Sequence, residues 1–116
     1  MLPDCPKSPN CVCSTASDAG HRIDPFPMRG DARATRAALV TLLEGWPRTT
    51  IVASEGDLVR AECRTRLLRF TDDVTFLVDE AAGCVHVRSA SRVGYSDLGA
   101  NRKRIEALRA AWLARR

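Results

Sequence analysis

The sequence predicts an α+β fold, a two-layer sandwich in which an N-terminal and a C-terminal helix cover one face of a four-stranded antiparallel meander. Apolar residues recur at helical spacing in two segments, one in the first half of the chain and one at its end. Between these segments lie four short runs in which apolar and polar residues alternate, as in half-buried strands. Helices at both ends of such a meander pack most economically on one face, because both then bury their apolar stripes in the same core.

The length and composition of the chain favour a single domain over residues 1–116. A chain of 116 residues has the usual size of one domain. Apolar residues make up 45% and charged residues 28%, which excludes a disordered chain and a membrane span. The first ten residues contain prolines and charges where a signal peptide needs an apolar segment. We therefore expect a cytoplasmic protein, or a periplasmic or secreted one if the start site is truncated.

The first 30 residues differ from the body of the domain, which we expect over residues 31–116. They hold five of the six prolines and show no sustained helical or strand period, which predicts an irregular arm laid over the domain. From Asp31 a helical stripe follows, with Gly45 and Pro47 as stop signals. The residues of that stripe are Thr35, Leu39, Leu42, Leu43 and Trp46.

Four strands are predicted in the middle of the chain. The first covers residues 48–54, and the second covers residues 58–68 after a Glu55-Gly56-Asp57 turn. Residues 70–73 form another turn before a third strand at residues 74–78. A turn at residues 80–83 then leads into the fourth strand at residues 85–89.

The last helix is expected to begin near Asp97, because an aspartate at this position accepts hydrogen bonds from the free backbone amides of the first turn. Leu98, Ile105, Leu108 and Trp112 form its inward stripe. Asn101 shares this stripe, and a buried amide needs hydrogen-bond partners. We expect Asn101 to fix the backbone of the preceding turn or of the arm, with direct ligand contact as the alternative.

Alternation leaves a polar and mostly basic set of side chains on the sheet face away from the helices. The set is Arg60, Glu62, Arg64, Arg66, Thr75, Leu77, His86, Arg88 and Arg92. One interpretation is a solvated face on which Glu62 and the arginines form cross-strand pairs. The other is that the arm crosses this face, so that the arginines line a groove for a carboxylate or phosphate.

Residues 92–102, which join the last strand to the last helix, are a second candidate anion site. Two glycines and small side chains leave backbone amides accessible near a helix N-terminus, and nearby arginines add positive charge. The spacing matches neither the P-loop nor the dinucleotide-binding motif. The predicted ligand-binding residues are Arg64, Arg88, Arg92, Tyr95, Asp97, Asn101 and Arg102.

Five cysteines, an odd number, exclude complete pairing within one chain. Two of them lie in apolar strand segments, where cysteine acts as a small buried hydrophobe. Cys5, Cys11 and Cys13 invite a chemical interpretation, because the proline-stiffened loop can bring Cys5 and Cys11 together. A disulfide, free thiols and a metal site that includes His21 are all compatible with the sequence, although the spacing is not that of reliable zinc motifs.

Four motifs span almost the whole chain. They are Cys5-Pro6-x-Ser8-Pro9-Asn10-Cys11-Val12, His21-x-Ile23-x-Pro25, Arg69-Phe70-x-Asp72-Asp73 and Arg88-Ser89-x-Ser91-Arg92-x-Gly94-Tyr95-Ser96-Asp97-x-Gly99-x-Asn101-Arg102. These motifs resemble the bacterial and plastid family catalogued as domain of unknown function 1499. The resemblance implies no established activity. Members often look exported or membrane-tethered, which suits a Cys5–Cys11 disulfide, and Cys13 stands where the family typically has serine.

The leading functional hypothesis is a non-catalytic binding module for an anionic small molecule or a partner segment, with its site between the arm, the sheet face and the last helix. The alternative is a thiol-redox or metal-binding protein that uses Cys5, Cys11 and Cys13. Nucleic acid is not expected as a partner, because Tyr95 is the only aromatic residue among the basic residues before Trp112. No arrangement of Ser, His and acid marks a catalytic site, and we predict no cofactor.

Overall fold

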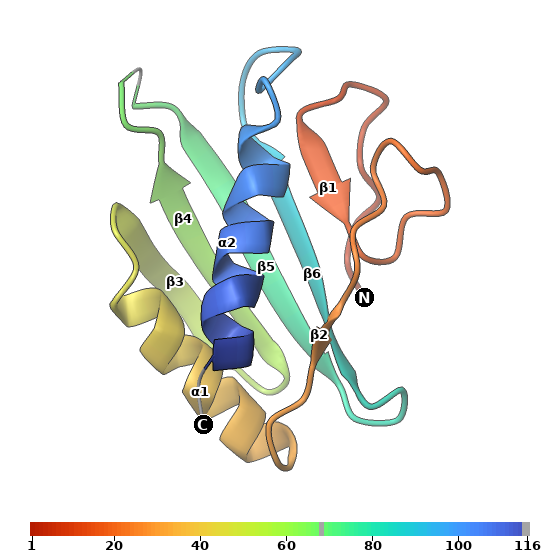
Figure 1. The fold of residues 1–116 in the computed structure, drawn as a ribbon, viewed down its shortest axis with the longest axis vertical. Coiled ribbons are helices and arrows are strands. Elements are labelled where there is room, and N and C mark those ends of the chain that lie inside the picture. Colours follow the sequence, from red (N-terminus) through yellow and green to blue (C-terminus); the bar gives the residue numbers. More distant parts are fainter. Residues whose placement is uncertain (68, 115–116) are drawn as a thin grey trace.

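The protein folds into two layers in a computed structural model that describes residues 1–67 and 69–114. Figure 1 shows one sheet with two helices, α1 and α2, lying across the same face. The predicted α+β class, with both helices on one face of an antiparallel sheet, is confirmed. Within the described residues, neither helix combines the length and the apolar character needed to cross a membrane.

The predicted meander forms the centre of the sheet. Its strands are β3 (Thr49–Glu55), β4 (Leu58–Arg64), β5 (Thr71–Asp79) and β6 (Cys84–Ser91). Each pairs antiparallel with the next along the chain. Val59, Val74 and Val87 are buried on the helix side, and the residues between such positions lie on the open face.

The arm is more regular than the sequence indicates. It contributes β1 (Cys11–Cys13) and β2 (Phe26–Pro27), which both pair with β6. Since the other edge of β6 pairs with β5, the two short strands share its outer edge and extend the sheet there. The expectation of an irregular arm laid over the domain is corrected in this respect. Strands of three and two residues are too short for alternation to reveal them, and they depend on β6 for their partner.

Both helices bury one stripe of side chains. α1 (Ala32–Glu44) begins where the Asp31 carboxylate accepts a hydrogen bond of 2.8 Å from the Ala34 amide. It packs on β3, β4 and β5, and α2 (Ala100–Ala114) packs on β6 and β1. The buried residues are Thr35, Leu39, Leu42 and Leu43 of α1 and Asn101, Ile105, Leu108 and Trp112 of α2.

Trp112 connects the last helix to the arm. Its ring centroid lies 6.2 Å from that of Phe26, and its Nε1 donates a hydrogen bond of 2.8 Å to the Pro27 carbonyl. The Arg29 guanidinium lies over the same ring, 5.3 Å from its centroid. The core therefore joins segments from opposite ends of the chain.

The second predicted strand ends earlier than the sequence indicates. β4 stops at Arg64, because Thr65 and Phe70 close a turn in which each amide donates a hydrogen bond of 2.8 Å to the other residue. Leu67, which continues the alternating pattern, is exposed, and residue 68 lies outside the described part of the chain. The predicted turn at residues 70–73 is also wrong, since β5 begins at Thr71 and buries Asp72.

Leu98 is not part of the inward stripe of the last helix. It lies outside α2 with a left-handed φ of 54° and is 88% exposed. Asp97 starts this turn by accepting hydrogen bonds from the amides of Gly99 at 2.8 Å and Asn101 at 3.0 Å. The cap is where the sequence predicts it, but two further residues precede the first turn of the helix.

Candidate functional site

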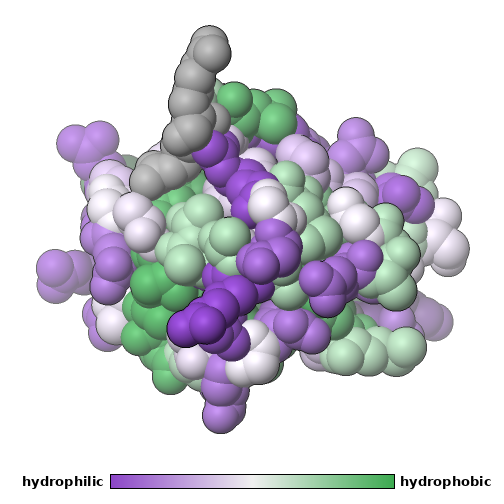
Figure 2. Space-filling model, turned by 90° about the horizontal axis from the view of Figure 1, so that it is seen from below, coloured by the Kyte–Doolittle hydropathy of each residue, from purple (hydrophilic) through white to green (hydrophobic). Residues whose placement is uncertain are grey.

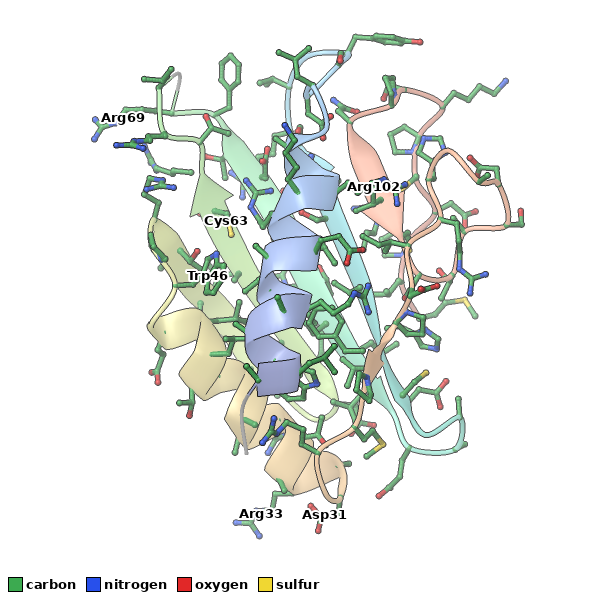
Figure 3. All side chains as sticks on the ribbon, in the orientation of Figure 1. Asp31, Arg33, Trp46, Cys63, Arg69 and Arg102 are labelled. Carbon is green, nitrogen blue, oxygen red and sulfur yellow. A yellow bond between two sulfur atoms is a disulfide. The ribbon has the colours of Figure 1, made fainter. Side chains whose placement is uncertain are left out.

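The predicted ligand-binding arginines do not meet in one site, because three of the four already bind other parts of the chain. Arg88 donates to the Asp4 carbonyl at 3.1 Å. Arg102 donates to the carbonyls of Arg22 at 3.0 Å and Gly20 at 3.2 Å. Figure 3 shows Arg102 on the arm side of α2, with Arg69 across the helix at the far edge of the molecule.

Arg92 is held by two carboxylates of the open sheet face. It donates two hydrogen bonds, of 2.9 and 2.8 Å, to Asp73 and one of 2.6 Å to Glu62. Glu62 and Asp73 stand directly opposite each other on β4 and β5, so Arg92 offsets the repulsion of two like charges. The hydrogen bonds that Arg92 donates to Asp73 and, second in effect, to Glu62 raise the pKa of Arg92. This is the cross-strand pairing that the sequence offers as one interpretation of the open face.

Asn101 has the structural role that the sequence favours. Its Nδ2 lies 2.7 Å from Asp97 Oδ2, 2.9 Å from Ser91 Oγ and 3.2 Å from the Asn10 carbonyl oxygen. Its Oδ1 accepts from Ser89 at 2.6 Å and from Arg104 at 3.0 Å. Asn101 is fully buried, so this network fixes the arm, β6 and the start of α2 relative to one another.

Asp97 belongs to the same network, and its ionised carboxylate caps the start of α2. Burial raises its pKa, but hydrogen bonds from the backbone and side chain of Asn101 and from the Gly99 amide outweigh that effect and hold the pKa below its usual range. The exposed Tyr95 follows Gly94, whose carbonyl accepts a hydrogen bond of 2.7 Å from Asn10. Asp97 and Asn101 therefore hold this loop in position, whereas Tyr95 is exposed beside it.

Cys5 and Cys11 form a disulfide. The third arm cysteine, Cys13, is a buried free thiol whose Sγ lies 3.1 Å from Thr15 Oγ1. The His21 ring contacts other groups: its Nε2 lies 2.8 Å from the Ser8 carbonyl oxygen, and its Nδ1 lies 2.7 Å from Asp18 Oδ2. The hydrogen bond to Ser8 and, second, the one to Asp18 raise the pKa of the ring. The alternative metal site of Cys5, Cys11, Cys13 and His21 is thus not formed, and in residues 1–67 and 69–114 no three His, Cys, Asp or Glu side chains are grouped to hold a metal ion.

We expect the Cys5→Ser variant to lose about 2 kcal/mol in free energy of unfolding, because the cross-link no longer restricts the unfolded chain. Denaturant unfolding of the oxidised proteins measures the difference. Cys84→Ser, which removes a half-buried free thiol, is the matched control and should change stability by no more than about 0.5 kcal/mol. An intact mass unchanged by reductant, with Cys5→Ser unfolding like the parent, would show that the two thiols are not joined.

A basic hollow lies at the start of β3 and the end of β4. Its volume is about 320 Å³, and four arginines line it, from the end of β4, the 65–70 turn and the residue before β3. The lining residues are Arg48, Thr49, Thr50, Glu62, Arg64, Thr65, Arg66 and Arg69. Glu62, the single carboxylate in this lining, forms an ion pair with Arg92. The hollow is therefore strongly positive.

The local fold determines where these arginines point. The Arg64 amide donates a hydrogen bond of 2.9 Å to the Arg48 carbonyl, which brings the start of β3 beside the end of β4. Arg66 and Arg69 belong to the turn closed by Thr65 and Phe70. Figure 3 shows Arg69 projecting outward from this turn. Arg48, Arg64, Arg66 and Arg69 are all exposed. No hydrogen bond or ion pair joins their guanidinium groups to another described residue.

An apolar hollow of about 380 Å³ lies between the 65–70 turn and the loop before α2. It is lined by Thr65, Arg66, Leu67, Phe70, Asp72, Ser91, Val93, Gly94, Ser96, Asp97, Leu98 and Ala100. Asp72 is buried, and its Oδ2 lies 2.7 Å from Arg104 Nη2 in an ion pair. The two hollows share Thr65 and Arg66, so one turn of the chain separates them.

The family model for proteins of unknown function (DUF1499) matches residues 1–112 of this chain. The chain belongs to the DUF1499 family. No curated protein and no solved structure shows significant similarity to it.

Many residues of the motifs that resemble DUF1499 gather in two regions of this structure. Asn10, Ser89, Ser91, Asp97 and Asn101 belong to the buried network between the arm and α2. The apolar hollow contains six motif residues, namely Phe70, Asp72, Ser91, Gly94, Ser96 and Asp97. In the basic hollow, Arg69 alone belongs to these motifs. The family pattern therefore coincides with the scaffold and the apolar hollow more closely than with the basic hollow.

Arg48 and Arg69 are not among the ligand-binding residues that the sequence predicts. Arg64 is the one predicted ligand-binding residue that lines the basic hollow, and the alternating pattern predicts a strand position for Arg66, which lies beyond the end of β4. Four arginines within residues 60–69 were a usable signal. Periodicity assigned them to a sheet face, however, and did not reveal the turn that gathers them with Arg48.

Proposed function

We propose that this DUF1499 protein is a non-catalytic binding module for an anionic molecule, which the arginines of the basic hollow bind. The observation that carries the proposal is that four guanidinium groups line one hollow without a partner among the described residues. Like charges held close together repel one another, and a bound anion relieves that repulsion. Elsewhere on the open face, the comparable Arg92 is already neutralised by two carboxylates.

The chemistry of the hollow favours a carboxylate or phosphate group. Arginine presents a planar fork of N–H donors that binds such groups through two parallel hydrogen bonds. A volume of about 320 Å³ suits a small molecule or one side chain of a partner segment. Arg48 and Arg69 also have left-handed backbone conformations, with φ of 54° and 56°, which non-glycine residues adopt mainly where the surrounding structure imposes them.

Binding of inorganic phosphate to matched charge variants tests this proposal. The variant Arg64→Gln/Arg69→Gln removes two charges from the hollow, and we expect it to weaken phosphate binding by about tenfold or more. Isothermal titration or NMR titration at low ionic strength measures the affinity. Added salt should weaken the binding of the parent protein, because the hollow is open to solvent.

The control variant, Arg22→Gln/Arg33→Gln, carries the same net charge. Both of its arginines are exposed, and Figure 3 shows Arg33 at the opposite end of the molecule from Arg69. We expect it to bind phosphate like the parent. Equal weakening in the two variants would mean that phosphate responds to overall charge, and the proposed site would be wrong.

A further inference from the structure

Exposed apolar side chains gather in two loops at one end of the molecule. Eight large apolar side chains are exposed in the described part of the chain, and five of them lie in the 65–70 turn and the loop before α2. They are Leu67, Phe70, Val93, Tyr95 and Leu98, and Leu67 and Leu98 are 89% and 88% exposed. The other three, Met1, Val52 and Leu113, belong to separate elements. Such a cluster marks a binding surface more often than isolated apolar residues do.

The opposite end of the molecule provides a comparison. Figure 2 views that end, where hydrophilic and hydrophobic residues are interspersed over the surface. The two apolar loops lie at the other end, at the top of Figure 1. Within the described residues, the exposed large apolar side chains are thus concentrated in these two loops.

The cluster surrounds a hollow of a size suited to a ligand. Its volume of about 380 Å³ falls in the range of roughly 300–1,000 Å³ typical of small-molecule sites. The charged groups beneath it are already engaged, since Asp72 pairs with Arg104 and Asp97 caps α2. The rim residue Leu98 has a left-handed backbone conformation and an exposed side chain. The hollow therefore offers hydrocarbon contacts at its rim and no unpaired cation of its own except Arg66.

The position of Arg66 connects this hollow to the basic one. Arg66 and Thr65 line both, so a molecule that enters the apolar hollow can present a charged group to Arg66 and its neighbours Arg64 and Arg69. A ligand that fills both needs an anionic end and a hydrocarbon part. Charge complementarity and apolar contact are satisfied together only by an amphiphile.

We propose that the ligand is an anionic lipid, whose hydrocarbon chain lies in the apolar hollow and whose charged head group lies on the arginines. This inference rests on the proposed function, because it identifies the anion bound at the basic hollow as a lipid head group. Each methylene of the chain that leaves water for the hollow strengthens binding. The same chemistry can reach the site from a bilayer or as a dispersed lipid molecule.

Two phosphate monoesters that differ only in their chains test the lipid assignment. Methyl phosphate offers the head group alone, and decyl phosphate below its micelle-forming concentration adds a hydrocarbon chain. We expect decyl phosphate to bind about a hundredfold more tightly, because several methylenes become buried. The variant Phe70→Ser/Leu98→Ser should lose most of that gain and keep its affinity for methyl phosphate. Both changed residues are exposed, so circular dichroism should show an intact fold.

The outcomes separate the two proposals. Equal affinity for the two esters would overturn the lipid assignment. If Arg64→Gln/Arg69→Gln still weakens methyl phosphate binding, the proposed anion site remains supported. No binding of either ester would overturn the anion site as well. Sedimentation with vesicles of phosphatidylcholine, with and without phosphatidylglycerol, identifies the source. Binding only to the anionic vesicles supports a bilayer lipid, whereas binding of decyl phosphate without vesicle binding supports a dispersed one.

Discussion

Replacing Arg104 with methionine is expected to lower the free energy of unfolding by about 3–5 kcal/mol, because it leaves the carboxylate of Asp72 buried without a counter-charge. Asp72 is 1% exposed, and its Oδ2 lies 2.7 Å from Arg104 Nη2. Neither carboxylate oxygen makes a hydrogen bond to another described residue, so the ion pair provides its main compensation. Arg104 also donates to Asn101 at 3.0 Å, and that contact is lost too. Denaturant unfolding measures the change.

Two further variants show whether the buried charge is responsible. Asp72→Asn/Arg104→Met removes both charges and should recover much of the lost stability, because an unpaired charge costs more than an unpaired amide. Lys103→Met alters an exposed neighbour and should stay within about 0.5 kcal/mol of the parent. A double variant as unstable as Arg104→Met alone would assign the loss to packing instead.

Trp112→Ala is expected to cost about 3–5 kcal/mol, because it empties the core between α2 and the arm. The indole is 1% exposed, packs near Phe26 and donates a hydrogen bond to the Pro27 carbonyl, which would lose its partner. The Arg29 guanidinium over the ring would lose its cation–π contact as well. Thermal and denaturant unfolding should both register the loss.

Leu113→Ala is the matched control for the tryptophan. Leu113 is the next residue of α2 and is 61% exposed, so its truncation should change the free energy of unfolding by less than about 0.5 kcal/mol. Similar effects of the two substitutions would mean that α2 is not anchored through its buried stripe. Hydrogen exchange at the backbone amide of Phe26 in β2 should accelerate in Trp112→Ala alone, because Phe26 borders the emptied space.

Helical and strand periods predicted most of the scaffold. The stripe of Leu39, Leu42 and Leu43 identified α1, and Ile105, Leu108 and Trp112 identified α2, because a helix buries every third or fourth residue whatever it packs against. The ends of elements were less predictable. Thr65 and Phe70 close a turn by hydrogen bonds that interrupt β4, although the alternating pattern continues past them.

The candidate site was only partly predictable, for a related reason. The alternating pattern predicted correctly that Arg64 and Arg92 lie on the open face of the sheet. Whether each arginine has a carboxylate partner depends on strand register. Register puts Glu62 opposite Asp73 beside Arg92, whereas Arg64 lies opposite Thr71 and has no carboxylate across from it. The sequence pattern does not specify register to one residue. It therefore could not separate a neutralised arginine from a free one.

The most direct test of anion binding at the basic hollow is a phosphate titration of isotopically labelled protein followed by NMR, including the arginine Nε–Hε signals. We expect the largest shifts at Arg64, Arg66 and Arg69 and at the amides of Thr65 and Phe70. Arg92 and Arg102 should respond little, because carboxylates and backbone carbonyls already hold them. Shifts that centre on Arg92, Arg102 and the loop before α2, with the four arginines of the basic hollow unchanged, would show that the basic hollow is not the anion site.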